Sequence, residues 1–162
     1  MRWRSLRTQL TVLSFAVTLV AILAVLFYVT PQLESSLRDQ KLRSLASTAR
    51  AYTPFIARVV RNNGSAHDID TVVAQVSELS NSRVTLLSVG NGTEGLQPVI
   101  FSDSTSQVAI TDLHFAIART AARTGHTATG SESSDQAELG QVAEPIRDEG
   151  TVSRVAVFST PM

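Results

Sequence analysis

Cysteine is absent from this 162-residue sequence, which excludes disulfides, thiol nucleophiles and cysteine-ligated metal sites. Charge is also scarce, because charged residues make up 17% of the chain, against roughly 25% in ordinary soluble domains. Lys plus Arg and Asp plus Glu both number 14. The sequence therefore lacks the basic excess of a general nucleic-acid binder, and we expect no nucleic-acid partner.

The scarcity of charge is concentrated near the N-terminus. No charged residue occurs between residues 8 and 33, and residues 10–29 are almost all apolar. About 20 apolar residues are needed for a helix to cross the hydrocarbon core of a membrane. Arg2, Arg4 and Arg7 precede this stretch without any acidic residue. The positive-inside rule therefore predicts a cytoplasmic N-terminus over residues 1–9 and a transmembrane helix over residues 10–29.

A cleaved signal peptide is the competing interpretation of the apolar stretch. The hydrophobic region of a signal peptide usually has about 7–15 residues and ends in a small-x-small cleavage site. Here the run is longer and ends in Phe27-Tyr28-Val29-Thr30-Pro31, without such a site. The sequence favours an uncleaved anchor, and it predicts a single-pass protein of the cell membrane with the remaining residues outside the cytoplasm.

Helical spacing resumes after the apolar stretch. Apolar residues recur every three to five positions from Leu33 to Val59, as on one face of a helix, and Pro54 predicts a bend or restart. A turn is expected at residues 62–65, followed by a short helix over residues 69–79 that Asp68 or Asp70 would cap. We assign residues 30–66 to a membrane-proximal helix and residues 67–162 to an extracytoplasmic domain.

The remainder of the chain alternates between strand-like and helical segments. Residues 83–89, 97–102, 126–129, 139–146 and 152–159 are expected to be strands, and residues 147–150 are a good hairpin turn. Residues 111–124 are expected to be a helix, with Thr111 as its N-cap and Gly125 as its stop. Strand hairpins on either side of a helix predict an α+β domain whose mainly antiparallel sheet carries helices on one face.

The residues that usually carry chemistry do not form a catalytic set. His67, His114 and His126 share no metal-binding spacing, and the acidic residues of segment 132–138 lack the order of a calcium loop. Neither Gly-x-Ser-x-Gly nor Ser-x-x-Lys occurs, and the glycine-rich turn at residues 90–95 is not followed by the Lys-Ser/Thr of a phosphate loop. We expect no catalytic residue, no metal and no cofactor in this chain.

Two segments carry a resemblance to a known family. Residues 4–10 and 28–38, on either side of the apolar stretch, resemble the N-terminus of bacterial transmembrane sensor histidine kinases. Residues 142–157, with Pro145-Ile146-Arg147-Asp148 before a Val-rich strand, are similar to the last hairpin of the PAS-like (Cache-type) extracellular sensors of these kinases. The resemblance implies the signal-input region of a two-component system that works as a dimer.

The kinase core of that family has no counterpart here. His114 is followed by Phe115 instead of an acidic residue, and there is no Asn-rich or Gly-x-Gly ATP-binding box. The chain therefore resembles the input half of a receptor and is not expected to be an enzyme. A response regulator would be a partner only through a kinase core outside this sequence.

Candidate binding residues follow from the expected arrangement. A pocket between the sheet and the helix at 111–124 would be lined by His114, Arg154 and Ser102, whose chemistry suits an anion. The ligand or physical stimulus is not encoded in any motif. The alternative function is a single-pass anchored domain that binds another envelope protein and does not signal.

The membrane-proximal helix also predicts a dimer seam. Leu33, Leu37 and Leu45 recur at helical spacing in a segment that is distant in sequence from the strands. An exposed leucine stripe is unfavourable in a monomer, so we expect a homodimer in the membrane whose seam contains these three leucines.

Overall fold

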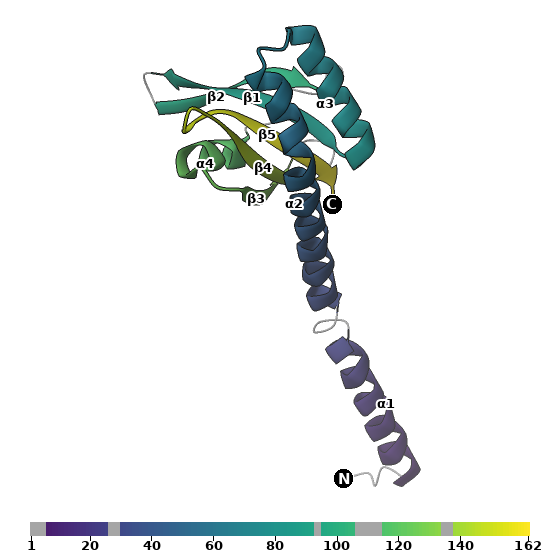
Figure 1. Cartoon of the computed structure of the whole chain (residues 1–162). Coiled ribbons are helices and arrows are strands. Elements are labelled where there is room, and N and C mark those ends of the chain that lie inside the picture. The colour runs from purple at the N-terminus through teal and green to yellow at the C-terminus, as the bar shows by residue number, and fades with distance from the viewer. Residues whose placement is uncertain (1–5, 26–29, 93–94, 106–114, 134–137) are drawn as a thin grey trace. The chain divides into compact units, whose positions relative to one another are not determined.

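The computed structural model describes residues 6–25, 30–92, 95–105, 115–133 and 138–162. These residues form two compact units, residues 1–39 and residues 40–162. The elements in chain order are α1 (Leu6–Ala24), α2 (Thr30–Arg61), α3 (Ala66–Ser80), β1 (Arg83–Gly92), β2 (Gly95–Asp103), α4 (Ala116–Thr124), β3 (Ala128–Ser133), β4 (Glu138–Asp148) and β5 (Thr151–Pro161) (Figure 1).

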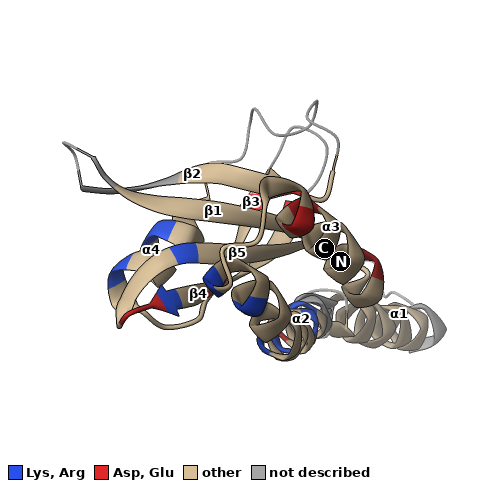
Figure 2. Ribbon diagram, turned by 45° about the horizontal axis from the view of Figure 1, so that its top comes forward, with Lys and Arg blue, Asp and Glu red and all other residues tan. Residues whose placement is uncertain are grey.

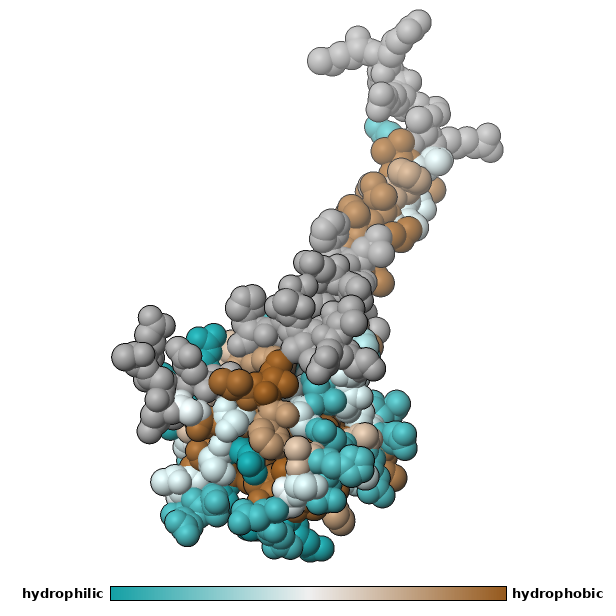
Figure 3. Space-filling model, turned by 90° about the horizontal axis from the view of Figure 1, so that it is seen from above, coloured by the Kyte–Doolittle hydropathy of each residue, from teal (hydrophilic) through white to brown (hydrophobic). Residues whose placement is uncertain are grey.

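Helix α1 belongs to the first unit and exposes apolar side chains around its surface. Ten large apolar side chains between Leu10 and Val25 are 43–73% exposed, and Figure 3 shows hydrophobic residues, with paler ones among them, along the described part of this helix. Among the described residues, no helix combines the length and apolar character of a membrane span. The predicted span continues into residues 26–29, which lie outside the described residues.

Helix α2 runs without interruption from Thr30 to Arg61, with Pro54 inside it. The restart that was expected at Pro54 is therefore absent from this described helix. A proline inside a helix removes one backbone N–H, but packing keeps this segment helical. Ala49, Ile56 and Val60 lie on the face of α2 that packs into the core of the second unit.

The sheet of the second unit has the strand order β2-β1-β5-β4-β3, and every neighbouring pair is antiparallel. The expected hairpin between β4 and β5 is confirmed. Its turn residues Glu149 and Gly150 have φ values of 47° and 88°, which suit a tight two-residue hairpin turn. A second hairpin, β1–β2, joins it where β1 pairs with β5, so that Val84 lies opposite Phe158.

Helices cover both faces of this sheet, and the expectation of helices on one face only is wrong. On one face, side chains such as Leu86, Val142 and Phe158 pack with α2 and α3. On the other face, Leu87 and Val155 pack with α4. Successive residues of a strand point to opposite faces. A central strand that is apolar at every position therefore contributes buried side chains to both faces of the sheet. Figure 1 shows α4 on the side of the sheet away from α2 and α3.

Helix α3 begins with a capping box, and its N-cap is Ser65 instead of the expected Asp68 or Asp70. The Ser65 side chain accepts a hydrogen bond from the backbone N–H of Asp68, and the Asp68 carboxylate accepts one from the backbone N–H of Ser65. The Ser65 hydroxyl also donates to Asp68 Oδ2 at 2.7 Å. These hydrogen bonds, first the one from the Ser65 side chain, lower the pKa of the Asp68 carboxyl below its usual value.

We expect Ser65→Ala to lower the free energy of unfolding by about 1 kcal/mol at neutral pH, because it removes the cap of α3. The difference from the wild type should shrink as the pH falls through the folded-state pKa of Asp68, since only the ionised carboxylate gains from the hydrogen bonds. Urea unfolding at several pH values measures both effects. Thr71→Ala, on the exposed surface of the same helix, is the control, and an equal loss in both variants would contradict the capping role.

Candidate functional site

One face of α2 carries a regular set of side chains that border a groove. Arg50, Thr53, Ala57 and Arg61 are separated by three, four and four residues, and this spacing places them on one side of a helix. Thr53 and Ala57 are buried, whereas Arg50 and Arg61 are exposed. The face therefore has a buried centre and a cation near each end.

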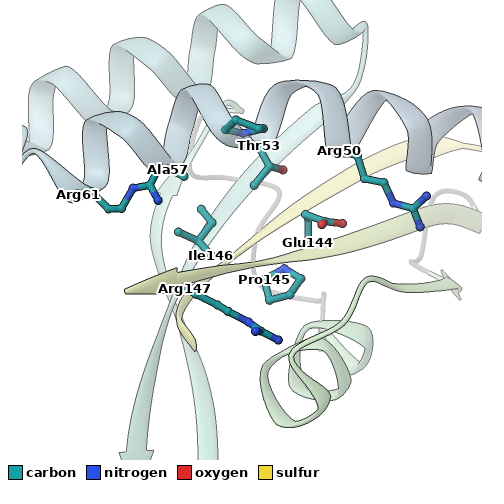
Figure 4. Close-up of a pocket in the computed structure, with 9 residues that line it drawn as sticks. Arg50, Thr53, Ala57, Arg61, Glu144, Pro145, Ile146 and Arg147 are labelled. Carbon is teal, nitrogen blue, oxygen red and sulfur yellow. The ribbon is translucent and has the colours of Figure 1, made fainter. Parts of the chain in front are cut away.

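Strand β4 forms the opposite wall of the groove. Glu144, Pro145, Ile146 and Arg147 line it together with the α2 residues, and the open groove has a volume of about 320 Å³. Figure 4 shows Glu144 and Ile146 on the side of β4 that faces α2, and Arg147 on the opposite side. Arg147 Nη2 donates to the carbonyl oxygen of Gly125 at 2.8 Å. The Arg147 guanidinium is therefore engaged at the end of α4 and does not face α2.

Thr53 supplies an unsatisfied polar group at the centre of the groove. Its side chain is 6% exposed, and Thr53 Oγ1 has no hydrogen-bond partner among the described residues. Figure 4 shows this oxygen directed from α2 toward the strand side of the groove. A buried polar atom without a partner costs about 1–3 kcal/mol, so a molecule that accepted a hydrogen bond there would recover part of that cost.

Charge is unevenly distributed around the groove. Figure 2 shows Lys and Arg residues on α2, on α4 and on the β4–β5 hairpin, acidic residues at the tip of that hairpin, and acidic residues on α3. Within the described residues, Arg50 and Arg61 make no hydrogen bond or ion pair. Glu144 is the acidic member of the lining, and Glu144 Oε2 accepts a hydrogen bond from Thr127 Oγ1 at 2.7 Å. The groove thus holds two free cations and one fixed carboxylate.

The structure does not bring together the three binding residues that the sequence suggested. His114 lies outside the described residues. The hydroxyl of Ser102, on the edge strand β2, donates to Asp70 Oδ1 of α3 at 2.6 Å. Arg154 lies opposite Ile146 in the register of the sheet, and its guanidinium carbon is 4.8 Å from the ring centroid of Phe101.

Ser102 and Arg154 consequently lie on the face covered by α2 and α3, because paired residues point to the same side of a sheet. Helix α4 packs directly on the other face through Ala118, Ala121 and Ala122. Ser102 and Arg154 are therefore not placed to line a pocket beneath α4.

A second group of polar side chains lies on the α4 face of the sheet. Gln141 and Ser159 are paired across β4 and β5 and are 1% and 3% exposed. Gln141 Nε2 and Ser159 Oγ have no partner within the described residues. Ser159 also pairs with Arg83 of β1, and both line an open hollow of about 510 Å³ that reaches the C-terminal end of α3. The cation of this hollow, Arg83, is paired with Asp103, and Glu78 is an exposed acidic residue of its lining.

Metal binding has no support in the described part of the chain, where no group of three or more His, Asp or Glu side chains could hold an ion. The groove residues themselves were absent from the sequence-based candidates. The available signal was the helical spacing of Arg50, Thr53 and Arg61, which places two arginines and a hydroxyl on one face. Glu144 carries no such signal, because its position opposite α2 depends on the pairing of the whole sheet.

Comparisons with known proteins return a structural likeness alone. No protein-family model and no curated protein sequence matches the chain. The sensory domain of the Campylobacter jejuni chemoreceptor Tlp3 aligns with a TM-score of 0.46 and 15% identity, over 83% of this chain and 64% of that one. The ligand-binding domain of the same receptor in complex with L-valine aligns with a TM-score of 0.45 and 13% identity, over 83% and 63%. The chain spans less than two thirds of these domains, and similarity at this level assigns neither a ligand nor an activity.

Proposed function

We propose that this chain is the membrane-anchored, extracytoplasmic signal-input region of a two-component sensor histidine kinase. The observation that carries the proposal is the position of the groove between α2 and β4. A molecule in the groove contacts both the sheet and a helix that extends back to Thr30. Binding there acts directly on the element that leaves the sheet toward the N-terminal segment.

The mechanism is a shift between two arrangements of α2 against the sheet. A ligand changes this equilibrium only by the difference between its affinities for the two states. A site shared by two elements provides such a difference, because its lining is complete in only one arrangement. The chain itself carries no catalytic step, and phosphorylation of a response regulator belongs to a kinase core outside this sequence.

The anchoring part of the proposal rests on α1 and the residues before it. The helix exposes large apolar side chains from Leu10 onward, and Arg2, Arg4 and Arg7 precede these apolar residues in the sequence. Such a charge bias places the N-terminus in the cytoplasm. Reporter fusions after Ser65 test the orientation: we expect alkaline phosphatase to be active there and a cytoplasmic fluorescent reporter to be silent. Activity of the cytoplasmic reporter alone would contradict the proposed orientation.

The signalling part is tested in a chimera in which residues 1–162 precede the second membrane span and kinase core of a sensor histidine kinase. We expect the double substitution Arg50→Gln, Arg61→Gln to change the kinase output severalfold. The matched double substitution Arg119→Gln, Arg123→Gln removes two exposed arginines of α4 that do not line the groove, and it should leave the output unchanged. Equal output from all three chimeras would favour the alternative function, an anchored envelope domain that does not signal.

Dimerisation of the membrane-proximal helix remains a prediction, with a narrower seam. Leu37 is 54% exposed, whereas Leu45 is 6% exposed and packs in the core of its own protomer. The side chain of Leu33 lies outside the described residues. The seam therefore reduces to Leu33 and Leu37, and burying an exposed leucine contributes roughly 1.5–3 kcal/mol.

We expect a cysteine at position 37 to cross-link between two chains in membranes more readily than a cysteine at Arg38 or Asp39. The neighbouring positions point to other sides of the helix, so they are matched controls in a chain that has no other cysteine. Disulfide formation on non-reducing gels gives the measurement. The same yield at all three positions would show that the Leu37 side of the helix is not a dimer seam.

A further inference from the structure

We infer that the groove between α2 and β4 binds a small organic dianion whose two acidic groups are separated by a body with a hydrogen-bond acceptor near its middle. This inference rests on the proposed sensory role of the groove and names the ligand class. It follows from the positions of four side chains along the groove. Arg61 lies at one end, Thr53 and Glu144 lie in the middle, and Arg50 lies at the other end.

The two arginines set the number and the separation of the acidic groups. Arg50 and Arg61 are eleven residues apart in α2. Their Cα atoms are therefore separated by about 16 Å along the helix axis, at roughly 1.5 Å per residue. Figure 4 shows their side chains at opposite ends of the groove, on the side of α2 that faces β4. Both guanidiniums lack a partner within the described residues, so each can turn toward the groove and take a carboxylate.

Glu144 excludes a compact anion from the centre. Figure 4 shows its carboxylate between the two arginines along the groove, and the Thr127 hydroxyl holds it in place. An acidic group placed at the centre would meet this like charge at short range. A ligand that keeps its charges at its two ends avoids the repulsion and meets both arginines.

The central part of the ligand is defined by Thr53 and the apolar lining. Thr53 Oγ1 is buried without a partner and is directed into the groove. A carbonyl or hydroxyl oxygen at mid-length would accept its hydrogen bond. The rest of the body lies against Ala57 and Ile146, which are apolar and suit a short hydrocarbon chain.

Binding of 4-oxopimelate and pimelate to the full chain in detergent micelles tests the inference. Both are dicarboxylates, and only the first has a ketone at its middle. We expect 4-oxopimelate to bind about fivefold more tightly than pimelate, the ratio that one net hydrogen bond provides. The preference should vanish in Thr53→Val, which keeps the shape of the side chain but removes the hydroxyl.

The arginines and Glu144 are tested in the same calorimetric titrations at constant ionic strength. Arg50→Gln and Arg61→Gln should each weaken 4-oxopimelate binding about tenfold or more, the effect of losing one charge-assisted hydrogen bond. Arg119→Gln, Arg123→Gln should leave it unchanged. Inorganic phosphate should bind weakly to the wild type and more tightly to Glu144→Gln.

Two results would overturn the ligand class: binding of neither dicarboxylate, or binding that does not depend on Arg50 and Arg61. The outcomes are separable from those of the proposed function. If 4-oxopimelate binds but leaves the output of the kinase chimera unchanged, the ligand class holds and the sensory role fails. If the groove substitutions change the output but no dicarboxylate binds, the sensory role holds and the ligand class fails.

Discussion

Phe158→Ala is expected to lower the free energy of unfolding by about 3–5 kcal/mol, the usual cost of removing a buried phenylalanine. Phe158 is fully buried on the central strand β5. It lies between Val84 of β1 and Val142 of β4 in the register of the sheet, and it belongs to the cluster that joins the sheet to α2 and α3. Its removal leaves a cavity at the point where the two hairpins and both helices meet.

Urea unfolding followed by circular dichroism measures this loss. A typical domain has only about 5–15 kcal/mol of stability, so the variant should unfold at a much lower urea concentration. Val99→Ala is the matched control, because Val99 lies on the edge strand β2 and is 63% exposed. We expect a change within about 0.5 kcal/mol for the control, and similar losses in both variants would show that Phe158 does not occupy a central position.

The second large effect is expected at the ion pair between Arg83 and Asp103. Arg83 Nε lies 3.2 Å from Asp103 Oδ1 and Arg83 Nη2 lies 3.1 Å from Oδ2, and the side chains are 16% and 4% exposed. The Asp103 carboxylate also accepts hydrogen bonds from the Thr85 hydroxyl and the backbone N–H of Thr105. Arg83→Met would leave this buried carboxylate without its counter-charge, at a cost of about 3–5 kcal/mol.

A double-mutant cycle separates the loss of the pair from the penalty of an uncompensated charge. Asp103→Asn removes the negative charge and keeps one acceptor oxygen, for either Thr85 or Thr105, because these two residues donate to different oxygens of the carboxylate. We therefore expect Arg83→Met, Asp103→Asn to be more stable than Arg83→Met alone, because the neutral amide has no missing counter-charge. If the double variant is less stable than Arg83→Met alone, the negative charge of Asp103 does not require Arg83 as its counter-charge.

The sequence predicted local structure well where each element is defined by its own residues. The β4–β5 hairpin follows from two apolar runs around a short polar turn that ends in Gly150, and α3 follows from the spacing of Ile69, Val73 and Val76. The sequence predicted Asp68 or Asp70 as the cap of this helix, whereas its N-cap is Ser65. Ser65 exchanges hydrogen bonds with Asp68, three residues further on. The expected N-cap Thr111 is wrong for the helix at 111–124, because α4 begins at Ala116 and its N-cap is Phe115.

Long-range pairing could not be predicted from these local patterns. The contact of Val84 with Phe158 joins residues 74 positions apart, and it decides which strands are central and which face meets which helix. Strand β5 is apolar on both faces between Val155 and Phe158, a pattern typical of a strand covered on both sides. This apolar run in the sequence indicates helices on both faces of the sheet.

The placement of the candidate binding residues depends on the same long-range pairing. Arg154 and Ser102 were assigned to the α4 side of the sheet, but the register of β5 and β2 places both on the α2 and α3 side. The groove itself combines a helix face that is visible in the sequence with Glu144, whose position is fixed only by β4 pairing with β5 and β3. The α2 side of the site was therefore predictable, and the β4 side was not.

Pro54 gives α2 a mechanical property that its continuous ribbon does not reveal. Proline has no backbone N–H, so the carbonyl oxygen of Arg50, four residues earlier, lacks its usual helical donor. The bending stiffness of α2 is consequently lowest in the turn between Arg50 and Pro54, which also lines the groove. The most easily bent turn of the helix therefore lies in the proposed binding groove, and a ligand bound there would act on the helix where the least work is needed to bend it.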